Sequence, residues 1–175
     1  SHEGYSAKPM HSYWDDFFTL KGLNDAASIA GVLAPSETAR YIAIAADAQT
    51  CFDESLKRAM ALKSIDYIPG CVELGDFDAT STAIGVWPCG QMERLPKLAL
   101  DRTFEKYWEF FQARRDGTLE WKDYTPYEIR IASTFTHLSL VDPKWKARTH
   151  ELLDFFMKDQ RPGPGGTVNY DGATE

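Results

Sequence analysis

The chain has little cysteine and no recognisable metal-ligand pattern. Its three cysteines, Cys51, Cys71 and Cys89, are an odd number and cannot all pair within one chain. Cys71 and Cys89 both fall in predicted loops, and a bridge between them is one arrangement that this placement allows. No Cys-x-x-Cys occurs, and the four histidines lack the spacing of zinc ligands. We therefore expect no bound metal and no cofactor.

Long apolar runs and an excess of basic charge are also missing. No run of about 18 apolar residues occurs, so we expect no membrane-spanning helix. Residues 1–9 lack the apolar stretch of a signal peptide. The formal net charge is −7, whereas phosphate backbones require a basic surface. We expect neither a membrane nor a nucleic acid as a partner.

Several common catalytic patterns are absent as well. The sequence contains no G-x-G-x-x-G, G-x-x-x-x-G-K-[ST], G-x-S-x-G or H-E-x-x-H segment. What it does contain is aromatic residues, which make up 13% of its 175 positions. Aromatic side chains fill cores, and their faces also stack on pyranose rings. The composition is therefore consistent with a well-filled core, with a sugar site, or with both.

Hydrophobic periodicity predicts helices along most of the chain. Three segments are amphipathic, with apolar residues recurring three and four positions apart. The other three are rich in small and apolar residues on most sides, which is typical of buried helices. The amphipathic segments are residues 36–63, 96–116 and 143–160; the apolar ones are residues 13–33, 79–87 and 126–140.

The two kinds of segment alternate, which indicates three helical hairpins, each with an inner and an outer helix. Six helices in this order predict an all-α fold that makes up half of a twelve-helix (α/α)6 toroid. A short superhelical stack is the alternative arrangement. We expect residues 1–162 to form this partial toroid and the Gly-rich residues 163–175 to form a flexible tail.

Acidic and aromatic residues gather before the three predicted inner helices, at residues 11–16, 73–78 and 121–128. Inner helices of such a ring run parallel, so their N-terminal ends should meet at one mouth. Carboxylates bind sugar hydroxyls, and aromatic rings stack on the sugar. Glycoside hydrolysis requires two carboxyl groups on opposite sides of the scissile bond.

Each cluster also has a structural interpretation. Asp78 is a good helix N-cap, and Thr125 with Glu128 has the spacing of a capping box. Ser12 and Asp15 have the same spacing. Asp16 and Asp76 are not explained by capping, and they favour the functional interpretation. Trp14 and Trp87 fit either a core or a sugar platform.

Three segments resemble motifs of bacterial six-hairpin glycosidase-like proteins. They are residues 4–18 (GYSAKPMHSYWDDFF), 66–80 (DYIPGCVELGDFDAT) and 124–130 (YTPYEIR). These proteins are distant relatives of glucoamylases and rhamnosidases, and they are often joined to discoidin domains of the coagulation factor 5/8 type. The resemblance covers residues 4–162. It implies a carbohydrate partner and a periplasmic or extracellular location.

The resemblance also suggests roles for particular residues. Trp14, with Asp15 or Asp16, would bind the sugar where the bond breaks, and Glu128, Asp76 or Asp78 would be the catalytic acid. The predicted substrate-binding set is completed by His11, Tyr127 and Trp87. Proteins of this group usually continue into further barrel, so we expect this chain to be a fragment that is inactive alone.

Two classes of function therefore remain from the sequence. The first is a glycoside hydrolase fragment, which predicts that Asp16, Asp76 and Glu128 converge on one cleft. The second is a non-catalytic helical module that binds a glycan or a protein. A weaker third option is a scaffold whose apolar inner-helix faces meet a partner, including a second copy of the chain in a homo-oligomer.

Overall fold

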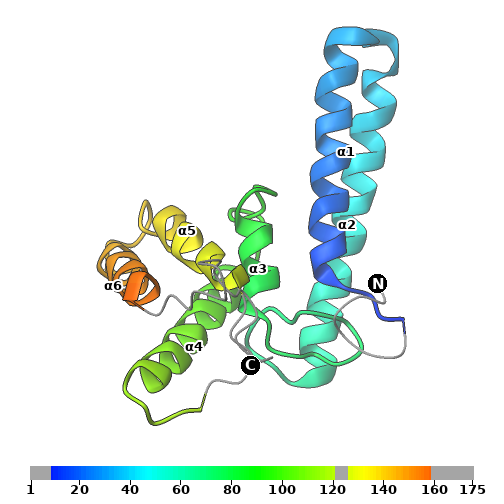
Figure 1. Ribbon diagram of the computed structural model, residues 1–175. Coiled ribbons are helices and arrows are strands. Elements are labelled where there is room, and N and C mark those ends of the chain that lie inside the picture. Colours follow the sequence, from blue (N-terminus) through cyan, green and yellow to red (C-terminus); the bar gives the residue numbers. More distant parts are fainter. Residues whose placement is uncertain (1–8, 121–125, 159–175) are drawn as a thin grey trace, which may run out of the picture. The chain divides into compact units, whose positions relative to one another are not determined.

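The computed structural model describes residues 9–120 and 126–158, and its regular elements are helical (Figure 1). This confirms the all-α class. The described part contains six α-helices, two 3-10 helices and no β-strand. Their bounds are α1 (Tyr13–Leu33), η1 (Pro35–Glu37), α2 (Thr38–Lys63), α3 (Ala79–Val86), α4 (Lys97–Arg115), η2 (Pro126–Glu128), α5 (Ile129–Leu138) and α6 (Lys144–Lys158).

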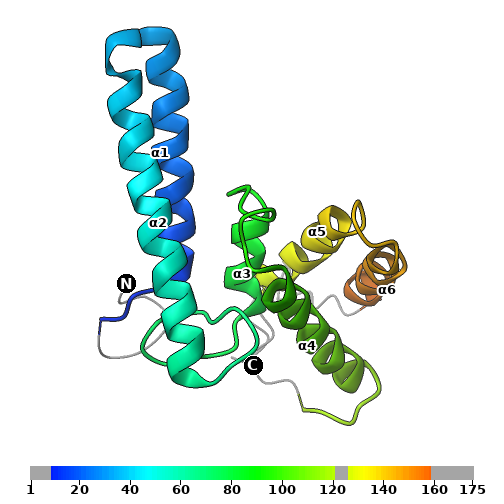
Figure 2. The ribbon, with the colours of Figure 1, turned by 180° about the vertical axis from the view of Figure 1, so that it is seen from behind.

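The chain forms two compact units, Ser1–Thr103 and Phe104–Glu175, whose boundary falls inside α4. In the N-terminal unit, α1 and α2 lie side by side as an antiparallel hairpin (Figures 1 and 2). Aromatic rings join the two helices near the start of α1. The Phe52 ring lies 5.6 Å from Tyr13, edge to face, and 5.3 Å from Phe17. The predicted first hairpin is therefore present.

Helix α3 packs against α1 at a very close contact. A Cβ atom added at Gly85 would lie 2.6 Å from the buried ring of Phe17, so glycine is required there. Asp78 caps the helix, because its carboxylate accepts from the amides of Thr80 and Ser81. The predicted N-cap is confirmed.

The C-terminal unit is built around an aromatic cluster. Phe135 of α5 is fully buried and contacts Phe104, Tyr107 and Trp108 of α4, and its ring lies 4.6 Å from Trp145 of α6. Helices α5 and α6 pack against each other as the predicted third hairpin. The Asp142 carboxylate accepts from the amide of Lys144 and caps α6.

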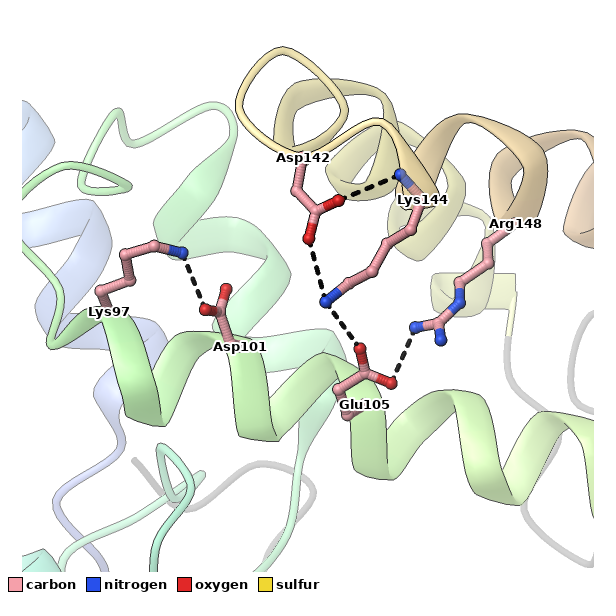
Figure 3. Close-up of polar contacts among 6 residues, drawn as sticks. All are labelled: Lys97, Asp101, Glu105, Asp142, Lys144 and Arg148. Carbon is pink, nitrogen blue, oxygen red and sulfur yellow. Dashed lines mark hydrogen bonds and ion pairs between the residues drawn. The ribbon is translucent and has the colours of Figure 1, made fainter.

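An ion-pair network joins α4 to α6 in this unit (Figure 3). Glu105 accepts from Lys144 at 3.0 Å and from Arg148 at 2.8 Å, and Lys144 also pairs with Asp142. The Arg148 guanidinium lies over the rings of Trp108 and Trp145, at 5.0 and 4.7 Å from their centroids. Charge and aromatic packing thus stabilise the same contact.

The cysteines and the helix lengths can be compared directly with the predictions from the sequence. All three cysteines are free thiols, so Cys71 and Cys89 form no bridge. None of the described helices is long and apolar enough to cross a membrane. The toroid and the 1–162 domain remain predictions, and residues 163–175 lie outside the described residues.

Candidate functional site

Two of the three predicted clusters meet at the N-terminal end of α1. The loop between α2 and α3 forms a β-bridge with the start of α1, between Cys71 and Ser12. The amide of Tyr13 donates to the Gly70 carbonyl, and the amide of Val72 donates to the His11 carbonyl, both at 3.0 Å. Residues about 60 positions apart in the sequence are therefore held together by main-chain hydrogen bonds.

Side chains strengthen this junction. The Glu73 carboxylate accepts from the His11 amide at 3.0 Å, and its other oxygen lies 2.5 Å from His11 Nδ1. These bonds from His11 hold the pKa of Glu73 below its usual value, although partial burial opposes the shift. Glu73 lies in a predicted cluster but had no assigned role. Its 62-residue separation from His11 left no local signal of their pairing.

Asp16 is the carboxyl group at this junction whose pKa is raised. It is half-buried, and burial raises its pKa, with a further increase from the neighbouring Asp15. His11 acts in the opposite direction but does not cancel these effects. A carboxyl group with a raised pKa keeps its proton to higher pH, and it can then donate one hydrogen bond and accept others.

Two aromatic side chains lie in the first two turns of α1, the part of the chain that also carries Asp15 and Asp16. Trp14 is partly exposed, and its ring packs at a tilt against Phe18, with centroids 6.0 Å apart. Ser12 precedes the helix as its N-cap but makes no side-chain capping bond, so the expected capping interaction is not observed. We call His11, Trp14, Asp15, Asp16 and Glu73 the α1 site.

The other predicted residues of the N-terminal unit have different surroundings. Asp76 accepts from the amide of Cys71 at 3.0 Å and fixes the turn of the loop. Both oxygens of Asp78 are engaged in capping α3, with bonds from the side chains of Thr80 and Ser81 as well as the amides. Trp87 is well exposed at the opposite end of α3 from Asp78, about 14 Å along the helix axis.

Glu128 and Tyr127 belong to the C-terminal unit. Glu128 is 2% exposed, and its two oxygens accept from Arg114 at 3.1 and 2.9 Å. This is a buried bidentate ion pair, with the guanidinium 5.1 Å from the centroid of Phe155. Tyr127 is about half-exposed, and the guanidinium of Arg130 lies 4.2 Å from the centre of its ring. Residues 121–125 of this predicted cluster lie outside the described residues.

An open groove of about 720 Å³ also lies in the C-terminal unit, along α6. Its polar lining includes Arg115, His150, Glu151 and Asp154, and Arg115 is paired with Glu151. None of the predicted site residues lines it. Within the described ranges, no group of three or more His, Cys, Asp or Glu side chains could hold a metal ion.

No protein-family model, curated protein or solved structure matches the chain. The α1 site therefore has to be interpreted from its own geometry. It combines an aromatic face, a pair of adjacent carboxyl groups of which one has a raised pKa, and a histidine fixed by a third carboxylate. Such a set offers stacking together with hydrogen-bond donors and acceptors, which is the combination that a neutral polyhydroxylated ligand requires.

Proposed function

We propose that this chain is a carbohydrate-active segment of a six-hairpin glycosidase-like protein and that it binds a sugar at the α1 site. The observation that carries the proposal is that Trp14, Asp15 and Asp16 all lie in the first turn of α1, at a junction fixed by the His11–Glu73 pair. The main-chain hydrogen bonds between the start of α1 and the loop hold these residues together without a ligand, and such preorganisation favours binding.

The residues of the α1 site make different kinds of contact with the sugar. The Trp14 ring packs against the apolar face of a pyranose. The carboxyl groups of Asp15 and Asp16 accept hydrogen bonds from hydroxyl groups of the sugar. The Glu73 carboxylate orients His11, whose second ring nitrogen can contact the sugar.

Binding is supported better than hydrolysis by the described residues. The three carboxylates assigned to catalysis each have a structural contact: Asp76 in the loop turn, Asp78 in the α3 cap and Glu128 with Arg114. A catalytic acid must release its proton to the leaving group, and a carboxylate bonded to a buried arginine is ill suited to that role. Hydrolysis in a complete parent protein would depend on Asp16 and on a second carboxyl group.

The proposal is tested by screening the 175-residue chain on a broad glycan array and measuring the affinity of the best oligosaccharide by calorimetry. We expect Trp14→Ala and Asp16→Asn each to weaken binding at least about tenfold. Asp47→Asn, an exposed change on α2, is the matched control and should bind normally. The absence of any binding glycan, or equal affinity in all variants, would reject the proposal.

Catalysis is measured on the same samples with aryl glycosides. We expect no turnover by the chain alone. Turnover that is lost in Asp16→Asn would instead show that the chain is an enzyme with Asp16 in its active site.

A further inference from the structure

The face of α1 that points away from α2 carries four exposed apolar side chains and, between them, the Lys21–Asp25 ion pair. Phe18, Ile29, Val32 and Leu33 are 43%, 57%, 79% and 78% exposed. The positions that face α2, among them Tyr13, Phe17 and Leu20, are buried. Most soluble helices place charged residues on the face opposite the core, so this second apolar stripe requires an explanation.

A glycine lies within the stripe. Gly22 follows Phe18 by four positions and precedes Ile29 by seven, so all three share one side of the helix. Glycine destabilises a helix interior relative to alanine. A Cβ atom at Gly22 would meet nothing within 4 Å, so packing within the chain does not require glycine there. Gly85, by contrast, is required by the Phe17 ring.

We propose that this face of α1 is the interface of a homodimer in which the α1 helices of two copies run antiparallel. A two-fold axis between Asp25 and Ala26 sets Gly22 opposite Ile29 of the second copy and Phe18 opposite Leu33 of the second copy. The large Ile29 side chain then fits against the gap left by Gly22, twice per dimer. This self-complementarity is the reason for choosing a second copy as the partner.

Charge along the stripe permits the contact. The ionised residue nearest the axis is Asp25, and Lys21 of the same helix pairs with it at 2.6 Å, so two copies can approach without facing unpaired carboxylates. Antiparallel alignment also sets opposite ends of the helix dipoles side by side.

The exposed area determines how strong the dimer is. The four apolar side chains expose roughly 400 Å² per copy, whereas a standard stable interface buries about 800 Å² per partner. We therefore expect a weak dimer that forms at high concentration and dissociates on dilution. The inference does not depend on sugar binding, and its test requires no glycan.

The test is sedimentation equilibrium of the 175-residue chain between about 1 and 500 μM. We expect a reversible monomer–dimer equilibrium that Ile29→Asp abolishes. Gly22→Ala should weaken dimerisation at least about tenfold while raising the melting temperature of the dilute monomer, because alanine favours the helix. A monomer at 500 μM would overturn the proposal.

Gly31→Ala is the matched control. Gly31 lies on the same helix but off the stripe, and a Cβ there would meet only Thr38, at 4.0 Å. It should raise the melting temperature in the same way and leave the dimer unchanged. Equal effects of the two alanines on association would contradict the interface, and circular dichroism checks that each variant folds.

Orientation is tested in a Cys51→Ser background, which removes the exposed cysteine. The double variant Phe18→Cys with Leu33→Cys should form a cross-linked dimer on oxidation, and Phe18→Cys alone should not. Cross-linking by Phe18→Cys alone would indicate parallel helices and would reject the antiparallel arrangement.

Discussion

Two ion-paired acids of the C-terminal unit and Asp16 of the α1 site have opposite electrostatic surroundings. In the C-terminal unit, Glu128 and Glu105 are neutralised by cations: Arg114 for the first, Lys144 and Arg148 for the second. At the α1 site, Asp16 lies beside another carboxyl group, and its pKa is raised. Acids in the first arrangement stabilise a fold, whereas an acid in the second opposes folding when it ionises, as is common at binding sites. The difference separates structural carboxylates from a functional candidate.

The largest expected effect comes from breaking the buried pair. Glu128→Gln leaves the Arg114 guanidinium buried without its counter-charge, and we expect the C-terminal unit to lose about 3–5 kcal/mol of stability. Hydrogen exchange of the α4 and α5 amides measures this loss for that unit. A loss below about 1 kcal/mol would show that the pair is not buried as described.

In the N-terminal unit, the next-largest expected loss of stability comes from a close packing contact. Gly85→Ala forces the buried Phe17 ring to move, and we expect a loss of about 1–3 kcal/mol in urea denaturation of this unit. The double variant with Phe17→Leu provides room for the new methyl group and should recover part of the loss. If the double variant loses more stability than the two single variants lose together, the contact between Gly85 and the Phe17 ring is not the cause of the loss.

The Glu105 network predicts a pH dependence. Burial raises the pKa of Glu105, but the bonds from Lys144 and Arg148 outweigh it, and the pKa is lowered overall. The ionised carboxylate therefore stabilises the fold above its usual value of 4.5, and this stability is lost as the pH falls through the lower folded pKa. Glu105→Gln should cost about 1 kcal/mol at pH 7 and flatten this part of the pH profile. An unchanged profile would contradict the role of the network.

The smallest expected effect is a gain in stability, whereas the preceding changes are expected to lower it. Because the pKa of Asp16 is raised on folding, its contribution to stability declines as the pH rises above the unfolded value near 3.8 and through the folded pKa. Asp16→Asn removes this cost, and we expect a gain of roughly 0.5 kcal/mol at pH 7 together with weaker sugar binding. Thermal melts at pH 4 and pH 7 measure the gain, and a loss of stability at both would show that Asp16 is structural.

The helices could be predicted closely because their signals are local. The expected starts at Tyr13 and Ala79 match α1 and α3, since Ser12 and Asp78 occupy the N-cap positions. Near Ser36 the match is looser, because a short 3-10 turn, Pro35–Glu37, precedes α2.

Partners distant in sequence could not be predicted in this way. The capping-box spacing drew attention to Glu128, but its observed partner, Arg114, lies 14 residues away on another helix. The pairing of His11 with Glu73 likewise depends on the loop that returns to α1. Such contacts are set by tertiary packing, which residue spacing alone does not encode.

The most direct test of sugar binding at the α1 site is a ¹H–¹⁵N NMR titration of the 175-residue chain with its best array glycan. We expect the largest shifts at the Trp14 indole and at the amides of residues 11–16 and 72–76, with small shifts along α6. Shifts confined to the α6 groove, or spread without a centre, would contradict the assignment of the site.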